Sequence, residues 1–155
     1  MNKNFFKTIL PNEIATLNLG KKIGNLSKTQ QKINIWLSGN LGTGKTTLCR
    51  GFLQALGSQD KIKSPSYSLL ESYHLSSCIV YHFDFYRISR LEELESLGLR
   101  DFFSKNAFYL VEWAEKSYGR FPSPDIKIWL DYHKESRIVE ITAYSLIGKN
   151  LLSSM

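Results

Sequence analysis

The stretch GNLGTGKTT at residues 39–47 constrains the fold of this chain more than any other feature of its sequence. Gly39, Gly42 and Gly44 alternate with small or polar residues, and a lysine and two threonines follow at once. Each glycine adds conformational entropy to the unfolded chain, so such a run usually marks backbone that other residues cannot adopt. The stretch therefore predicts a tightly turned loop with a structural or chemical task.

The segments on either side predict a strand before this loop and a helix after it. In KINIWLSG the apolar residues Ile33, Ile35 and Leu37 alternate, as in a strand. After the loop, apolar residues recur at helical spacing as far as Gly57, which suits a helix C-terminus: Leu48, Cys49, Phe52, Leu53 and Leu56. The order is strand, glycine loop, helix.

In this context, Gly39-x-x-x-x-Gly44-Lys45-Thr46 matches the phosphate-binding P-loop pattern. Glycines let successive backbone N–H groups turn toward an anion, and the helix that follows points its positive end at the same place. Lys45 would reach the β- and γ-phosphates, and the Thr46 hydroxyl would ligate Mg²⁺. A tight turn with an incidental lysine and threonine is disfavoured, because pattern and context agree. The expected nucleotide-binding residues are Gly39, Asn40, Leu41, Gly42, Thr43, Gly44, Lys45, Thr46 and Thr47.

Two acids end two β-rich runs, Asp84 in HFDFYR and Glu112 in LVEW. A carboxylate at the C-terminal end of a strand beside the P-loop strand can hold Mg²⁺ or orient an attacking water. Glu112 follows four apolar residues, as a Walker B acid does, although aspartate is more usual there. Surface carboxylates at strand ends are the alternative for both. His82 shares the strand face of Asp84; a packed or hydrogen-bonding histidine is favoured over a metal ligand, since no third ligand is evident.

A hydroxyl-rich loop, Ser64-Pro65-Ser66-Tyr67-Ser68, follows the P-loop helix. In P-loop proteins a loop at this place often closes over the γ-phosphate. Sequence chemistry alone favours a plain Ser-Pro turn.

The remaining segments complete an α/β pattern. Residues 12–26 suit a helix that Gly20 and Gly24 weaken. CIVYHFDFY and AFYLVEW are β-rich, and the second is apolar enough for a parallel strand covered on both faces. Ser89 and Glu92 have capping-box spacing before a short helix that reaches Gly98. DIKIWLDY and SRIVEITAY suggest an antiparallel C-terminal hairpin. We expect one domain over residues 1–155, with a P-loop NTPase-like, mostly parallel central sheet flanked by helices.

Composition bounds the setting of the protein. The longest apolar run, residues 107–111, is far shorter than a membrane span, and the N-terminus has no signal-peptide pattern, so we expect a cytoplasmic protein that does not enter a membrane. Cys49 and Cys78 show no metal-ligand spacing and are expected to be reduced, structural thiols. The net charge of +6 is compatible with an acidic partner, although the lysines are scattered.

Taken together, five motifs resemble the bacterial TsaE (YjeE) family in order and spacing. They are GNLGTGKTTLCRGFLQALG, SPSYSLLESY, HFDFYR, the LGL of residues 97–99, and Glu112-Trp113. The likeness covers nearly the whole chain. That family consists of small P-loop ATPases required for making threonylcarbamoyladenosine in tRNA.

The resemblance implies roles for individual residues. The P-loop residues would bind ATP, with Thr46 on Mg²⁺; Glu112 would be a metal-binding or catalytic acid, and Asp84 the second acid. Lys45 belongs with these acids as a catalytic group. Ser66 in the switch loop and Trp113 would lie at the nucleotide. The implied partners are TsaD, which transfers the threonylcarbamoyl group, and TsaB, which pairs with TsaD; contact with tRNA is expected to be indirect.

The chain departs from the family pattern at a few positions. Asn40 stands where the family usually has aspartate, Thr43 where it has alanine, and Ser66-Tyr67 where it has Thr-Phe. None removes a group that the P-loop needs, because the loop acts mainly through backbone N–H groups. Asn40 does remove a charge beside the site, which leaves open any partner contact that the acid makes.

Other functions share parts of this pattern. A nucleoside or nucleotide kinase begins with the same strand, loop and helix, and Asp84, Arg87 and Arg90 imitate part of its machinery, but no arginine-rich lid follows. A GTP-dependent switch lacks its Asn-Lys-x-Asp signature here. A module that binds RNA directly would show a steep salt dependence of tRNA affinity. Arg87 is the nearest candidate for an arginine finger.

Overall fold

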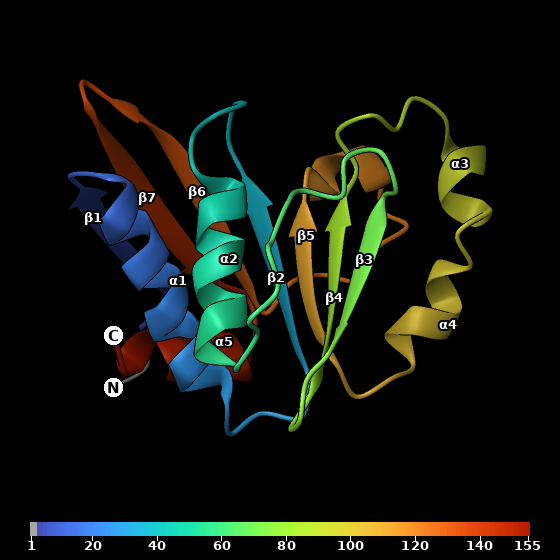
Figure 1. The fold of residues 1–155 in the computed structure, drawn as a ribbon, viewed down its shortest axis with the longest axis horizontal. Helices are drawn as coiled ribbons and strands as arrows, with labels where there is room; N and C mark the ends of the chain where they lie inside the picture. Colours follow the sequence, from blue (N-terminus) through green and yellow to red (C-terminus); the bar gives the residue numbers. More distant parts are fainter. Residues whose placement is uncertain (1–2) are drawn as a thin grey trace.

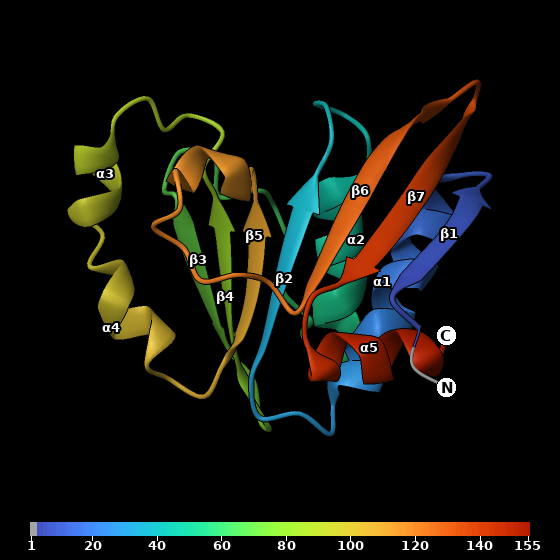
Figure 2. The same ribbon diagram turned by 180° about the vertical axis from the view of Figure 1, so that it is seen from behind.

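The computed structural model describes residues 3–155 as a seven-stranded sheet with helices on both faces (Figures 1 and 2). The strand order is β1-β7-β6-β2-β5-β4-β3. The strands are β1 (Phe5–Leu10), β2 (Ile33–Ser38), β3 (Leu70–His74), β4 (Ile79–Asp84), β5 (Phe108–Glu112), β6 (Ile126–His133) and β7 (Ser136–Ala143).

The sheet is parallel in its centre and antiparallel at both edges. Strand β2 pairs in parallel with β5 on one side and β6 on the other, and β5 pairs in parallel with β4. The β6–β7 hairpin, β1 against β7, and β3 against β4 are antiparallel. The expected parallel sheet with an antiparallel C-terminal hairpin is confirmed, and the P-loop strand β2 lies in its middle.

Helices lie on both faces of the sheet, and each face has its own hydrophobic core. The helical segments are α1 (Glu13–Ser27), α2 (Lys45–Ala55), α3 (Leu91–Glu95), α4 (Leu99–Phe103), the 3₁₀ turn η1 (Ala114–Ser117) and α5 (Leu146–Ser153). Helices α1 and α2 lie side by side over one face, where the core is rich in Leu and Ile (Figure 1). The other core is rich in aromatic rings and includes Phe83, Tyr109 and Phe121.

Several elements differ from the sequence-based expectation. Strands β1 and β3 and helices α4 and α5 were not expected, and the segment from Leu91 to Gly98 contains a five-residue helix rather than one that reaches the glycine. The acid that accepts from Ser89 is Glu93, not Glu92: its Oε1 accepts from the Ser89 and Arg90 backbone N–H groups. The capping interaction is therefore shifted by one residue. No helix within residues 3–155 is long and apolar enough to cross a membrane.

Candidate functional site

The carboxyl ends of β2, β4 and β5 meet at one edge of the sheet, and a cavity of about 410 Å³ lies there. Parallel strands bring their carboxyl ends to the same edge, which is where open α/β sheets bind ligands. The lining residues come from the glycine loop, the start of α2, the Ser-rich loop at residues 64–68, and the ends of β4 and β5 with the residues after them: Leu41, Gly42, Gly44, Lys45, Thr46, Thr47, Ser64, Ser66, Asp84, Tyr86, Arg87, Glu112 and Trp113.

The glycine loop has the backbone geometry that its sequence requires. Gly39, Gly42 and Gly44 have φ values of +132°, +76° and +109°, in the region that favours glycine. A Cβ on Gly39 would lie 2.1 Å from the Leu130 carbonyl oxygen, so the first glycine also allows a close backbone approach. Helix α2 begins at Lys45, directly after the loop. Its N-terminal N–H groups are thus available to an anion at the loop.

Lys45 is folded over the loop and beneath an indole ring. Its Nζ donates to the carbonyl oxygens of Gly39 at 2.6 Å and Asn40 at 2.7 Å. The same Nζ lies 4.7 Å from the Trp113 ring centroid, in cation–π contact. Burial lowers the pKa of the ammonium, while the charges of Glu112 and Asp84 oppose that shift. The lysine therefore lies among the acids expected to share its site.

Glu112 and Thr46 are in direct contact. The Thr46 Oγ1 lies 3.1 Å and 3.3 Å from the two carboxylate oxygens of Glu112, which is 2% exposed. Hydroxyl and carboxylate oxygens are ligands that Mg²⁺ prefers. The two residues expected to hold the metal thus present adjacent ligand atoms.

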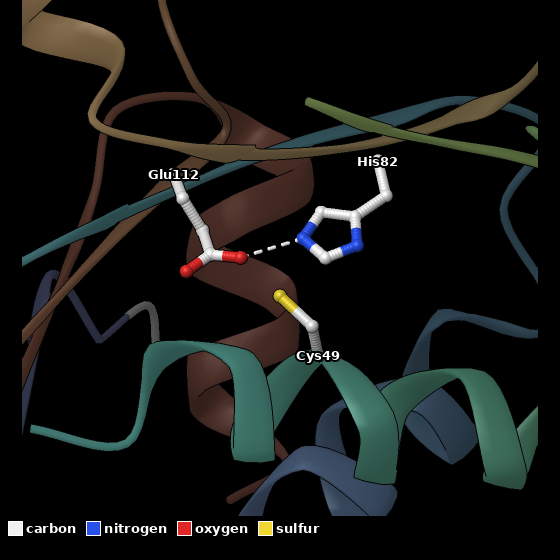
Figure 3. A group of neighbouring side chains, drawn as sticks. All are labelled: Cys49, His82 and Glu112. Atoms are coloured by element: carbon white, nitrogen blue, oxygen red, sulfur yellow. Dashed lines mark hydrogen bonds and ion pairs between the residues drawn. The ribbon is translucent and has the colours of Figure 1, made fainter. Parts of the chain in front are cut away.

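His82 approaches the same carboxylate from the sheet (Figure 3). Its Nε2 lies 2.7 Å from Glu112 Oε2, and both side chains are buried. The expectation of a hydrogen-bonding histidine agrees with this contact. Cys49 on α2 places its Sγ, within 4.8 Å of the other donor atoms, beside the pair. Cys49 and Glu112 are 63 residues apart in the sequence, so no local pattern indicates that they lie together. The sequence predicted only that Cys49 is a structural thiol.

Asp84 is buried and held by two hydrogen bonds. Its Oδ1 accepts from the Tyr86 backbone N–H at 2.9 Å, and Oδ2 accepts from the Ser64 hydroxyl. Burial raises the pKa of Asp84, and these two hydrogen bonds limit the increase. Asp84 and Glu112 are register partners across β4 and β5, so the two expected acids lie next to each other.

The Ser-rich loop lies against this site. Ser64 and Ser66 line the cavity, whereas Tyr67 is 83% exposed. The Arg87 guanidinium stacks over the Tyr67 ring at 4.0 Å from its centroid. A loop that carries both an inward hydroxyl and an exposed aromatic ring can contact a ligand on one side and a partner on the other.

Trp113 has a backbone conformation that is rare for its residue type. Its φ is +58°, and its ring packs against Tyr86 at 5.1 Å between centroids. Lys116 donates to the Tyr86 carbonyl oxygen and lies over the same two rings. Sequence reasoning missed Tyr86 and Lys116. Strained conformations of this kind often occur at functional sites.

A second cavity, of about 310 Å³, adjoins the glycine loop on its other side. Gly42, Gly44 and Thr47 border both cavities. The further lining residues come from the end of β1, the start of α1, the glycine loop, and β7 with the turn before it: Leu10, Asn12, Glu13, Thr16, Thr43, Glu135 and Arg137.

The β6–β7 hairpin holds the glycine loop from outside. The Tyr132 hydroxyl donates to the Leu41 carbonyl oxygen at 2.8 Å, and Arg137 Nη2 lies 3.4 Å from the Gly42 oxygen. The Arg137 guanidinium stacks on Tyr132, 4.4 Å from its centroid.

Most expected site residues therefore meet around the larger cavity. The exceptions are Gly39 and Asn40, whose carbonyl oxygens face Lys45, and Thr43, which lies at the second cavity and donates to Asn40 O at 2.8 Å. The Asn40 side chain is exposed and does not line this cavity.

Comparison with known proteins identifies the family of this chain. The family model described as "Threonylcarbamoyl adenosine biosynthesis protein TsaE" matches residues 10–139. The "tRNA threonylcarbamoyladenosine biosynthesis protein TsaE" of Haemophilus influenzae is 42% identical over 148 residues, 94% of both chains. The protein of the same name from Nostoc is 33% identical and covers 96% of this chain and 92% of its own. The crystal structure of Bacillus subtilis YdiB has the same fold, with a TM-score of 0.80, 24% identity, and coverage of 99% of this chain and 95% of YdiB. The chain thus belongs to the TsaE family of threonylcarbamoyladenosine biosynthesis proteins.

Proposed function

We propose that this protein is a Mg²⁺-dependent ATPase that assists threonylcarbamoyl transfer to tRNA by acting on a TsaD–TsaB complex. One observation carries the proposal: Lys45, Thr46, Asp84 and Glu112 converge on one cavity beside a loop whose glycines have positive φ. Such a loop, a charged lysine and paired acids are what phosphoryl transfer from a nucleotide requires.

Each residue has a distinct part in this proposal. Backbone N–H groups of residues 39–47 bind the phosphates, and Lys45 supplies positive charge to the terminal ones. Thr46 and Glu112 hold Mg²⁺, which when bound neutralises charge that develops on the phosphates. Asp84 accepts a hydrogen bond from the attacking water and orients it. Ser64 and Ser66 lie close enough to the cavity to respond to its contents.

The two cavities suggest how the nucleotide is oriented. The larger contains the acids and Lys45, so the terminal phosphate belongs there. Thr47 and Gly42 lead from it to the second cavity, where Asn12, Glu13 and Arg137 offer polar groups. We place the nucleoside in this second cavity.

The proposed partner contact involves the Ser-rich loop. Tyr67 and Arg87 form an exposed stacked pair next to cavity-lining Ser66. A loop that changes with the nucleotide would change this pair, and with it the docking of TsaD and TsaB. Because the partners complete the cycle in this proposal, hydrolysis by the isolated protein is slow. The proposal further holds that contact with tRNA is indirect and that the protein acts in the cytoplasm.

The test is ADP release from ATP and Mg²⁺ by the purified protein, first alone and then with its cognate TsaD and TsaB. We expect stimulation by the pair, and its loss in Lys45→Ala and Glu112→Ala. If TsaD and TsaB have no effect while a nucleoside stimulates ADP release, the proposal is wrong and the protein is a kinase instead.

A further inference from the structure

His82 is a buried polar residue in the middle of a strand, which requires a physical explanation. It lies in β4, is 0% exposed, and faces α2 rather than solvent. An imidazole removed from water is costly unless its ring nitrogens find hydrogen-bond partners. Its position two residues before Asp84 also places it on the Asp84 face of the strand.

Among residues 3–155, the one side-chain hydrogen bond of His82 goes to the proposed metal ligand. Nε2 lies 2.7 Å from Glu112 Oε2, while Thr46 Oγ1 contacts both oxygens of the same carboxylate. Glu112 is therefore held from two directions, by α2 and by the neighbouring strand. Its terminal torsion, which would otherwise be soft, is restrained.

The second ring nitrogen shows which hydrogen bond orients the histidine. Within residues 3–155, Nδ1 is buried and has no hydrogen-bond partner. A carboxylate only accepts hydrogen bonds, so Nε2 carries the proton that the pair shares. Among the described residues, the contact with Glu112 is thus the side-chain hydrogen bond that orients the imidazole ring.

Cys49 is close enough to raise the alternative of a metal centre. Its Sγ, an imidazole nitrogen and a Glu112 oxygen all lie within 4.8 Å of one another (Figure 3). Burial raises the pKa of the Cys49 thiol well above its usual range, which disfavours the thiolate that binds metals. The 2.7 Å contact is a hydrogen-bond distance, and a closed structural zinc site needs four ligands. We therefore regard Cys49 as a packing neighbour.

From this geometry we propose that His82 is a positioning residue, which holds the Glu112 carboxylate in the orientation that binds the divalent cation. The inference rests on the proposed function, since it assigns His82 a task in the same nucleotide site. Groups that hydrogen-bond to metal ligands orient them, and their loss typically lowers metal affinity about 10- to 100-fold.

The test measures ATP affinity of the full chain by calorimetry, in EDTA and over a range of Mg²⁺ concentrations. His82→Leu removes the donor, whereas the amide of His82→Gln can occupy the Nε2 position. We expect the Leu variant to bind ATP with wild-type affinity in EDTA. It should need an Mg²⁺ concentration about 10- to 100-fold higher than the wild type before the cation changes its ATP affinity. The Gln variant should follow the wild type.

Cys49→Ala is the matched control, because it disturbs packing in the same cluster and leaves the His82–Glu112 contact in place. It should unfold at lower temperature and keep the wild-type Mg²⁺ response. A wild-type response in His82→Leu, or an equal shift in His82→Gln or Cys49→Ala, would overturn the positioning role.

A replacement variant and a wild-type measurement complete the test. Should His82→Leu not fold, His82→Asn replaces it, because the shorter amide reaches only the Nδ1 position; the Asn variant should show the shift and Gln should not. Equal shifts in both amide variants count against the role. A wild-type protein whose ATP affinity ignores Mg²⁺ would instead refute the proposed function itself.

Discussion

At the residue scale, the site keeps two charged groups in surroundings that disfavour their charges. Burial raises the pKa of Asp84 and lowers that of Lys45. Neighbouring groups oppose both pKa shifts. The hydrogen bonds from Ser64 and Tyr86 limit the increase at Asp84, and the charges of Glu112 and Asp84 limit the decrease at Lys45. Groups perturbed in this way are typical of functional sites, where stability is lost in exchange for reactivity.

The Asp84 carboxyl gives a prediction about stability and pH. A raised folded-state pKa means that the folded protein holds this proton over a pH range in which the unfolded chain has lost it. The free energy of unfolding therefore falls as pH rises through that range, and the loss persists at neutral pH. Asp84→Asn should raise the thermal midpoint at pH 7 and lower the ATPase rate about 100-fold.

Scanning calorimetry at several pH values checks the first effect, and ADP release the second. Asp60→Asn is the control, because Asp60 is exposed and should leave the midpoint nearly unchanged. A lower midpoint for Asp84→Asn than for the wild type at pH 7 would show that burial does not dominate at this carboxyl.

At the scale of elements, α1 and α2 touch backbone to backbone. A Cβ on Gly20 would lie 2.1 Å from the Leu48 carbonyl oxygen, and one on Gly51 2.0 Å from the Leu17 oxygen. Gly20, which weakens the prediction of α1, is therefore required by packing, and so is Gly51 in α2. Since α2 begins at Lys45, this contact also fixes the direction in which the helix points its N-terminus at the site.

Gly20→Ala and Gly51→Ala should each destabilise the protein, although alanine favours helix by about 1 kcal/mol over glycine. Overpacking of a close contact costs about 1–3 kcal/mol and often more where backbone is struck. Urea denaturation measures the balance. The control is Asn18→Ala at an exposed position of α1, which should be neutral or stabilising; a stabilised Gly51→Ala would contradict the close contact.

The β6–β7 hairpin makes a second prediction at this scale. Tyr132→Phe removes the donor to the Leu41 carbonyl and leaves the ring under Arg137. A lost hydrogen bond is worth about 0.5–1.5 kcal/mol, so ATP affinity should fall roughly 2- to 10-fold as the loop loosens. Tyr144→Phe, at an exposed tyrosine, should bind ATP as the wild type does. If Tyr132→Phe and Tyr144→Phe bind ATP with equal affinity, the hairpin does not contribute to nucleotide binding.

At the scale of the whole molecule, a ligand that binds only the folded state stabilises all of it. At 100 times the Kd the gain is about 2.7 kcal/mol, which for a domain of this size is about 5–11 °C in midpoint. We expect this shift with ATP and Mg²⁺ and its absence in Lys45→Ala. A wild-type midpoint that does not move under these conditions would contradict nucleotide binding.

The sequence predicted which residues gather at the cavity better than it predicted the periphery, for physical reasons. The P-loop residues and the two acids are specified by local chemistry and by the rule that parallel strands share an edge. Strand β1 was missed because its exposed Phe5 and Ile9 blur the alternation expected of a half-buried strand. The proximity of Cys49 to Glu112 depends on how α2 packs across the sheet, which periodicity does not reveal.

The bonds of Lys45 determine how its ammonium is presented to a nucleotide. Its Nζ already donates to two carbonyl oxygens of the loop, at 2.6 Å and 2.7 Å. An ammonium carries three N–H donors, so one remains for an incoming phosphate. Nucleotide binding therefore need not order a long, mobile side chain, because the conformational entropy of this lysine is already lost when the protein folds.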